Sequence, residues 1–148
     1  MRTLQNWLDE YSISHQNPLN KKIHWICVPL ITASLIGIIW SISPVVALLI
    51  LVLMLVFYVR LSIPLFFVMA LFSAIVVVFV VILSGPLTTA LSTPIWFYIG
   101  LFVIGWIGQF YGHKVEGKKP SFFKDLQFLL IGPAWCASYL MKKIKLAP

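Results

Sequence analysis

The residues of this chain best suited to chemistry are its three histidines, His15, His24 and His113. The first two precede the first long apolar run, and the third follows the last one. On a helix, Gln109, His113 and Glu116 are spaced i, i+4 and i+7 and would share one face. Imidazole is a common ligand of iron, zinc, copper and nickel, and a nearby carboxylate adds an oxygen ligand. These residue types indicate a metal site, provided that the fold brings the two ends of the sequence together.

The segment that carries His15 and His24 must bend to bring both rings to one place. The two residues are nine positions apart, which is half a turn out of phase on a continuous helix. Pro18 disfavours a helical conformation at Asn17. We therefore expect a bent loop that turns both imidazoles inward, with hydrogen bonds from Asn17 and Asn20 to hold it.

Spacing alone leaves the metal site open, because His-x-x-Glu is a weak motif and two histidines nine positions apart are a weaker one. Three histidines near a membrane surface can also be ordinary polar residues of the interface. Two observations favour a site. The chain has no other histidine, and Gln109 is drawn into the end of an apolar run, where polar groups are costly and tend to mark function.

The elements that must position these residues are membrane-spanning helices. The chain has 148 residues, of which 61% are hydrophobic and 10% are charged, whereas a soluble domain is about half apolar and about a quarter charged. A helix needs about 20 mostly apolar residues to cross the hydrocarbon core. The stretches that qualify are 25–42, 44–60, 64–84 and 94–112. We expect an all-α, polytopic membrane helix bundle with four transmembrane spans that forms a single integral membrane domain over residues 1–148.

Shorter segments flank these spans. A short amphipathic helix near the N-terminus is predicted by apolar residues at i, i+3, i+4 and i+7, namely Leu4, Trp7, Leu8 and Tyr11. Residues 84–93 are uncharged and turn-rich, which predicts a connector. Residues 122–141 have lysines at both ends and a Gly132-Pro133 break. We expect a re-entrant or interfacial C-terminal helical pair there rather than a fifth span, with Asp125 as a candidate cap.

The basic residues lie on one side of the predicted bundle. The net charge is +7, and when four spans cross alternately, every Lys and Arg lies on the face of the N-terminus. Because Lys and Arg stay on the cytoplasmic side of short loops, we expect the N-terminus and all three histidines to be cytosolic. The charges flank membrane spans, so orientation and anionic lipid headgroups explain them better than nucleic acid does.

The two histidine-bearing segments resemble a known enzyme family. Residues 15–29, "HQNPLNKKIHWICVP", and 105–133, "GWIGQFYGHKVEGKKPSFFKDLQFLLIGP", are similar in the order of their motifs to the membrane 2-hydroxy fatty acid dioxygenases. This family is known from fungal α-oxidation and has many bacterial members. The middle spans match it only in hydrophobicity. The fungal form has one more residue between the histidine and the acid, so this chain departs from that pattern at Glu116.

The resemblance implies an Fe(II)-dependent membrane dioxygenase of fatty acid α-oxidation. Together with the charge distribution, it leads us to expect a bacterial inner membrane location with a cytosolic active site. The enzyme would convert a 2-hydroxy long-chain fatty acid and O2 to the one-carbon-shorter acid and CO2. Carried over to this chain, the iron ligands would be His15, His24 and His113, and Glu116 would be a ligand or the partner of one. Supporting residues would be Asn17, Asn20, Gln109 and Asp125. The lysines that could attract the substrate carboxylate, if they are not simply solvated, are Lys21, Lys22, Lys118 and Lys119.

Two other functions remain open at this stage. A zinc-dependent membrane amidase or esterase would use three histidines equally well, with bound water as the nucleophile. A non-enzymatic scaffold or small transporter is the other, although the mid-bilayer stretches contain no charged residue that would mark an ion path. Because the substrate of the dioxygenase supplies all four electrons to O2, that reaction needs no nucleotide cofactor, and no nucleotide-binding motif is present. Substrate chain length and oligomeric state are not indicated.

Overall fold

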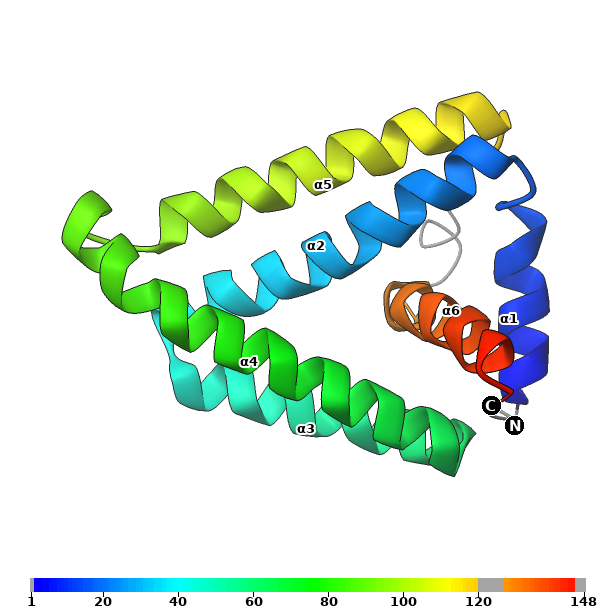
Figure 1. The fold of residues 1–148 in the computed structure, drawn as a ribbon, viewed down its shortest axis with the longest axis horizontal. Coiled ribbons are helices and arrows are strands. Elements are labelled where there is room, and N and C mark those ends of the chain that lie inside the picture. The colour runs from blue at the N-terminus through cyan, green and yellow to red at the C-terminus, as the bar shows by residue number, and fades with distance from the viewer. Residues whose placement is uncertain (1, 120–126, 146–148) are drawn as a thin grey trace.

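A computed structural model describes residues 2–119 and 127–145, and these residues form only helices (Figure 1). The helices are α1 (Leu4–Ile13), α2 (Pro18–Ile42), α3 (Pro44–Leu61), α4 (Ile63–Leu91), α5 (Ile95–Glu116) and α6 (Phe128–Lys143). Four of them, α2 to α5, are long and apolar enough to cross a membrane. The predicted all-α bundle with four candidate spans is therefore confirmed, and it is consistent with an integral membrane protein.

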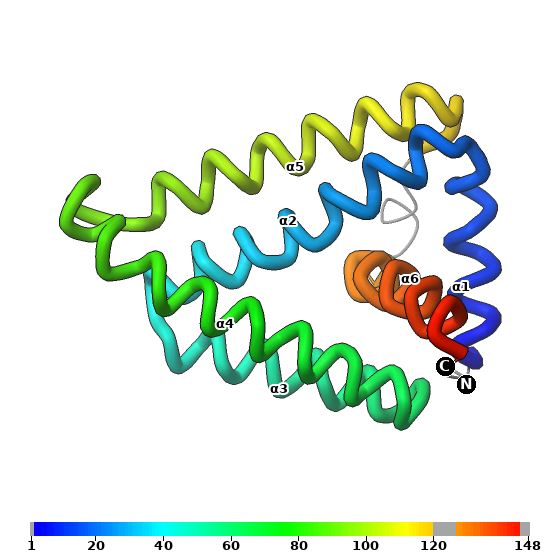
Figure 2. Tube along the Cα trace, in the orientation of Figure 1, coloured from blue at the N-terminus to red at the C-terminus, as the bar shows by residue number. Residues whose placement is uncertain are grey.

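The spans form two pairs that diverge from one end of the molecule. Helices α2 and α5 lie side by side, as do α3 and α4, and the pairs meet where α2 passes into α3 and α4 passes into α5 (Figures 1 and 2). Helices α1 and α6 lie at the opposite, open end, together with the start of α2 and the end of α5. The two histidine-bearing parts of the sequence therefore meet at this end.

The starts of three spans follow from local sequence. The side chains of Asn17, Ser43 and Ser62 accept hydrogen bonds from backbone N–H groups in the first turns of α2, α3 and α4. A proline follows at the first or second helical position of each. The cap satisfies one of the free N–H groups of the first turn, and proline has no N–H to leave unpaired there.

The helix that contains the predicted first span, 25–42, begins before that span for the same local reason. Helix α2 begins at Pro18, because Asn17 caps it. Only the residues between Ile13 and Pro18 form a linker, so the bent loop expected around His24 is not present, and His24 lies on a helix.

Two further expectations from turn-forming residues were wrong. The expected connector 84–93 is largely helical, because α4 continues through Pro86 to Leu91, and the hydroxyl of Ser84 donates to the carbonyl of Val80 at 2.7 Å. The expected break at Gly132-Pro133 is also absent, since α6 is continuous from Phe128 to Lys143. Buried residues flank Pro133 on both sides in α6, so tertiary packing outweighs the local preference of proline. Residues 122–126 of the segment 122–141, which include Asp125, lie outside the described residues.

Glycines allow α5 to lie close against α2. The glycines that face α2 are Gly105, Gly108 and Gly112. A Cβ atom at Gly108 would lie 2.5 Å from the Cys27 sulfur, and one at Gly112 would overlap the Asn20 side-chain oxygen. Small residues at such positions let membrane helices approach closely. Because the two helices run in opposite directions, this contact aligns the start of α2 with the end of α5.

The amphipathic helix near the N-terminus is confirmed as α1. Its apolar face is buried, and the residues on that face are Leu4, Trp7, Leu8 and Tyr11. The rings of Trp7 and Phe128 lie edge to face with centroids 5.2 Å apart. The indole N–H of Trp135 donates to the Ser12 hydroxyl at 2.9 Å. These contacts place α1 against α6 at the open end of the bundle.

Candidate metal centre

Three separate segments bring the three histidines together. His15 lies in the linker after α1, His24 in the first half of α2, and His113 in the last turn of α5. One ring nitrogen from each residue lies within 4.8 Å of the other two. The exposed fractions of these side chains are only 0%, 1% and 4%. The cluster could hold a metal ion, and it depends on the antiparallel packing of α2 and α5.

Backbone carbonyls orient two of the three rings. The Nδ1 atom of His15 lies 2.6 Å from the carbonyl oxygen of Tyr11, and the Nδ1 atom of His24 lies 3.0 Å from that of Asn20. Because a carbonyl oxygen can only accept, each Nδ1 must carry the proton, which leaves Nε2 with a free lone pair. Such a hydrogen bond is the usual partner of a metal-ligating histidine.

The cluster contains ring nitrogens that have no partner within the described part of the chain. These are Nε2 of His15 and Nδ1 of His113, and both are fully buried. Buried polar atoms are nearly always hydrogen-bonded, so an unpaired pair in one cluster needs an explanation. A metal ion bound between the imidazoles would supply it, and the all-nitrogen donor set suits iron, zinc, copper or nickel.

Burial also keeps His15 in the form that binds metal. It lowers the pKa of this imidazole from its usual value to about 4, more than the neighbouring carbonyl and Glu116 raise it. The ring is stacked on that of Tyr11, with centroids 4.1 Å apart and planes 9° from parallel, and it also contacts the ring of Trp135. At neutral pH the imidazole is therefore uncharged and held in one orientation.

Glu116 holds the linker that carries His15. Its Oε1 accepts a hydrogen bond from the backbone N–H of Gln16 at 2.8 Å. Its Oε2 accepts from the backbone N–H of Asn17 at 2.8 Å and from the side-chain amide of Asn20 at 3.0 Å. Both carboxylate oxygens are thus engaged in joining the end of α5 to the linker between α1 and α2. The predicted role of Glu116 as a metal ligand stays a prediction.

The two predicted supporting asparagines lie in the same network. Asn17 caps α2 by accepting from the N–H of Leu19 at 2.8 Å. Asn20 is fully buried and donates to the carbonyl of Ser14 at 3.1 Å as well as to Glu116. Gly117 ends α5 in a left-handed conformation with φ of 71°, so the chain turns directly after Glu116. Local caps at both helix ends therefore hold the linker in place.

The four lysines predicted to attract a substrate do not share one location. Lys118 donates to the carbonyl of Ile13 at 2.7 Å and so braces the end of α1. Lys119 is exposed beyond the end of α5. Lys21 and Lys22 line a different cavity from the one beside the histidines. Their role in substrate binding stays a prediction.

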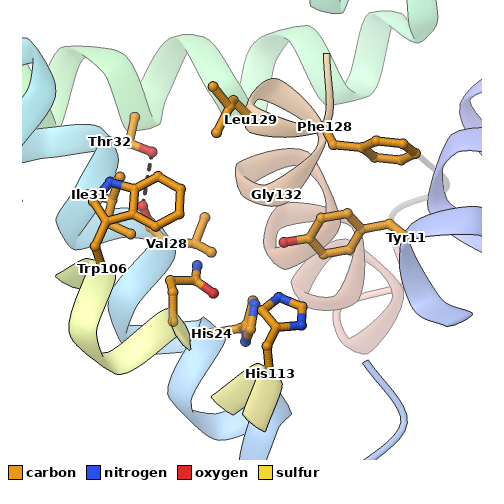
Figure 3. A pocket seen from close by; sticks show the side chains of 11 residues that line it. Tyr11, His24, Val28, Ile31, Thr32, Trp106, His113, Phe128, Leu129 and Gly132 are labelled. Atoms are coloured by element: carbon orange, nitrogen blue, oxygen red, sulfur yellow. Dashed lines mark hydrogen bonds between the residues drawn. The ribbon is translucent and has the colours of Figure 1, made fainter. Parts of the chain in front are cut away.

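A pocket of about 50 Å³ adjoins the cluster, and His24 and His113 both line it (Figure 3). Gln109, which was predicted as a supporting residue, is 7% exposed and also lines this pocket. Figure 3 shows the Tyr11 side chain reaching in from α1, on the same side of the pocket as Gly132. A Cβ atom at Gly132 would lie 3.1 Å from the Tyr11 hydroxyl, so the phenol passes close to α6.

An apolar groove between α2, α3, α5 and α6 adjoins this pocket. The groove has a volume of about 340 Å³, and the residues that it shares with the pocket are Ile31, Thr32, Trp106 and Leu129. The hydroxyl of Thr32 donates to the carbonyl of Val28 at 2.9 Å, so it is satisfied within α2. The remaining lining is apolar, including Met54 and Phe102. The pocket beside the histidines therefore lies next to an apolar groove.

Several residues of this site were missed in the sequence. Tyr11 was expected only as part of an apolar face, although its spacing of four residues before His15 would have allowed a contact between the two. Trp106, Phe128 and Trp135 had no local signal, since aromatic residues are common in membrane helices and only packing decides which of them face a pocket.

Comparison with known proteins adds a family to this geometry. The sequence profile described as 2-hydroxy-palmitic acid dioxygenase Mpo1-like matches residues 1–144. No curated protein and no solved structure matches the chain. The profile covers all three histidines and all four candidate spans, which confirms the suspected family. Its name indicates a dioxygenase of 2-hydroxy fatty acids. The chain therefore belongs to the 2-hydroxy-palmitic acid dioxygenase Mpo1-like family.

Proposed function

We propose that this protein is an Fe(II)-dependent membrane dioxygenase that shortens a 2-hydroxy long-chain fatty acid by one carbon. The observation that carries the proposal is the cluster of three buried imidazoles from three segments. One ring nitrogen of each lies within 4.8 Å of the other two, and the cluster adjoins a pocket that borders an apolar groove. Membership of the dioxygenase family supports the same chemistry.

The reaction balances without a further substrate. One 2-hydroxy acid and one O2 give the shortened acid, one CO2 and one water, and the substrate supplies all four electrons. His15, His24 and His113 would hold the iron through imidazole nitrogens. When bound, ferrous iron would supply the redox-active centre at which the hydroxy acid and O2 meet. The hydrogen bonds to Nδ1 of His15 and His24 would keep both rings in the ligating orientation.

Two polar side chains are suited to bind the head of the substrate. The Tyr11 hydroxyl and the Gln109 amide line the pocket beside the histidines, and neither makes a hydrogen bond to another described residue. A hydroxyl and an amide are both donors to a carboxylate. We assign to them the orientation of the carboxylate and hydroxyl of the substrate next to the imidazoles.

The apolar groove is suited to the acyl tail. It begins at the pocket, shares Ile31 and Trp106 with it, and runs along the membrane-spanning parts of α2, α3 and α5. Each CH2 group that leaves water for an apolar site contributes about 0.8 kcal/mol. The length of the groove would therefore favour long chains over short ones, and the carboxylate would stay at the basic end of the bundle. We place this end at the cytosolic face of a bacterial inner membrane, as the charge distribution favours.

Oxygen uptake and metal content together test this function. Anaerobically purified protein would be loaded with Fe(II) and given 2-hydroxypalmitic acid, with palmitic acid as the matched control. We expect equal amounts of O2 consumed and CO2 released with the hydroxy acid, and none with palmitic acid. The variants His24→Ala and His113→Ala should lose both bound iron and turnover.

The same measurements separate the alternatives. Zinc at full occupancy, together with cleavage of a lipid amide or ester without O2, would indicate a hydrolase instead of a dioxygenase. Unchanged metal content in both histidine variants, together with no oxygen uptake by the wild type, would indicate a protein that is not an enzyme.

A further inference from the structure

A second and larger cavity lies on the other side of α6 from the histidines. It has a volume of about 760 Å³, lies between α1, α2 and α6, and shares no lining residue with the pocket beside the metal centre. Trp135 lines this cavity and packs against the rings of Tyr11 and His15. The Trp135 side chain therefore forms part of the wall that separates the two spaces.

The cavity is strongly basic. The lysines that line it are Lys21, Lys22, Lys142 and Lys143. The carboxylate that lines it, that of Asp9, accepts a hydrogen bond from the side-chain amide of Gln5 at 2.6 Å. Positive charge thus exceeds negative charge in a space at the end of the bundle where the basic termini of the spans gather, which favours an anionic ligand.

A buried polar atom without a partner also faces this cavity. Ser138 is 3% exposed, it lines the cavity, and its hydroxyl has no hydrogen-bond partner in the described part of the chain. Such an atom is rare in proteins and calls for an explanation, which a bound polar group would supply. The hydroxyl can donate to an anionic oxygen, so it points to the same kind of ligand as the lysines do.

A second apolar groove adjoins the cavity. This groove has a volume of about 250 Å³, lies between α2, α4 and α6, and shares Trp25 and Leu140 with the basic cavity. The rings of Trp25 and Tyr139 meet edge to face at 5.2 Å, where the polar and apolar parts join. Aromatic residues at such a boundary are typical of the membrane interface. Together the two adjoining spaces offer a basic part suited to an anionic headgroup and an apolar part suited to an acyl chain.

We propose that these two adjoining spaces together form a binding site for an anionic membrane phospholipid. The phosphate group would lie among the four lysines and accept a hydrogen bond from Ser138, and an acyl chain would lie along the groove between α4 and α6. A free fatty acid fits less well, because one carboxylate needs neither a cavity of about 760 Å³ nor four lysines. Basic pockets at the membrane interface are known to select anionic headgroups.

Lipid retention in native mass spectrometry tests the site directly. The full-length protein would be taken from nanodiscs that contain equal amounts of dioleoyl phosphatidylglycerol and dioleoyl phosphatidylcholine. We expect retention of about one phosphatidylglycerol per protein and a preference over phosphatidylcholine of about 100-fold or more, since each of the four lysines adds about 1 kcal/mol for an anionic lipid. Equal retention of the two lipids would overturn the proposal.

Matched variants locate the binding. Lys142→Gln with Lys143→Gln should reduce the preference about 30-fold. Arg60→Gln with Lys114→Gln, which removes the same charge from exposed positions outside the cavity, should not change it. Ala137→Phe, which fills the groove without changing charge, should lower phospholipid retention as well. Equal losses from both charge variants would contradict a specific site.

Competition separates the phospholipid from the substrate. Added 2-hydroxypalmitic acid should leave the retained phosphatidylglycerol in place, and the Lys142 and Lys143 variants should keep their iron content. If the hydroxy acid displaces the phospholipid one for one, the cavity belongs to the substrate and the proposal is wrong. Because lipid retention does not depend on turnover, this result is independent of whether the dioxygenase activity is found.

Discussion

His15 and Tyr11 contact each other twice. Their rings are stacked with centroids 4.1 Å apart, and Nδ1 of His15 lies 2.6 Å from the carbonyl oxygen of Tyr11. The last turn of α1 therefore sets both the tilt and the protonated nitrogen of a candidate metal ligand. A helix that looks peripheral in the sequence is thus part of the candidate metal centre.

The two roles of Tyr11 can be separated by substitution. Tyr11→Phe keeps the stacked ring and the carbonyl but removes the hydroxyl. We expect unchanged metal affinity and a fall in kcat/KM of about tenfold, which corresponds to one lost hydrogen bond of about 1.4 kcal/mol. Tyr11→Ala should also weaken metal binding. Cobalt titration and steady-state kinetics would measure both, and a normal kcat/KM in the phenylalanine variant would exclude contact between the hydroxyl and the substrate.

Removal of one histidine side chain should lower metal affinity more than removal of any side chain that only supports the histidines. We expect His24→Ala to lower affinity by more than the roughly 10- to 100-fold effect that follows the loss of a supporting hydrogen bond. Inductively coupled plasma analysis of purified protein would measure this. Lys114→Ala, an exposed change on α5 near His113, is the control. Equal metal content in the two variants would exclude the histidine cluster as the metal-binding site.

Substitution of Glu116 distinguishes a metal ligand from a residue that only holds the linker between α1 and α2. If it only holds the linker through Gln16 and Asn17, then Glu116→Gln should weaken cobalt binding by about 10- to 100-fold. The absorption spectrum of the saturated variant should nevertheless match that of the wild type. A changed spectrum at saturation would mean that the carboxylate binds the metal. Glu10→Gln is the matched control. It makes the same change at a carboxylate on α1 and should leave cobalt binding unchanged.

Acid should destabilise the metal-free protein through His15. Its pKa is lowered to about 4 in the folded state by burial, while it is about 6.5 in an unfolded chain. The unfolded state therefore binds more protons between these values, so the free energy of unfolding falls as the pH drops from about 6.5 to about 4, by an amount on the order of 3 kcal/mol. Above pH 6.5 this group should have no effect. Thermal unfolding of wild type and His15→Gln in detergent would measure the difference, and parallel pH profiles of the two proteins would contradict it.

The contact between α5 and α2 should be sensitive to a single methyl group at the site. Gly112→Ala would place a Cβ atom against the Asn20 side-chain oxygen and push apart the helices that carry His24 and His113. We expect lower thermal stability, by about 1–3 kcal/mol as for other overpacked positions, and weaker metal binding. Gly100→Ala on the same helix meets no atom within 4 Å and should be neutral. Similar losses in both variants would show that helix propensity, not this contact, is responsible.

The sequence by itself determined the architecture and the candidate ligands. Each span is a continuous apolar run, and hydropathy is a local property that does not depend on what the helix packs against. The spacing of Leu4 and Tyr11 likewise predicted an amphipathic helix, which the structure confirms as α1. The even number of spans also implied that residues before the first and after the last would lie at the same end.

Only the tertiary structure decided how the site is built. Helix α6 continues through Pro133 because packing on both sides stabilises it, whereas the local preference of proline predicted a break. Lys21 and His24 lie three positions apart on α2, a spacing that gives them neighbouring places on the helix. They nevertheless line different cavities, because the packing of α1 and α6 against α2 divides the space around them. The bonds from Glu116 to Gln16 and Asn17 join residues that are distant in sequence. Such contacts arise only when the helices pack, so no local pattern can predict them.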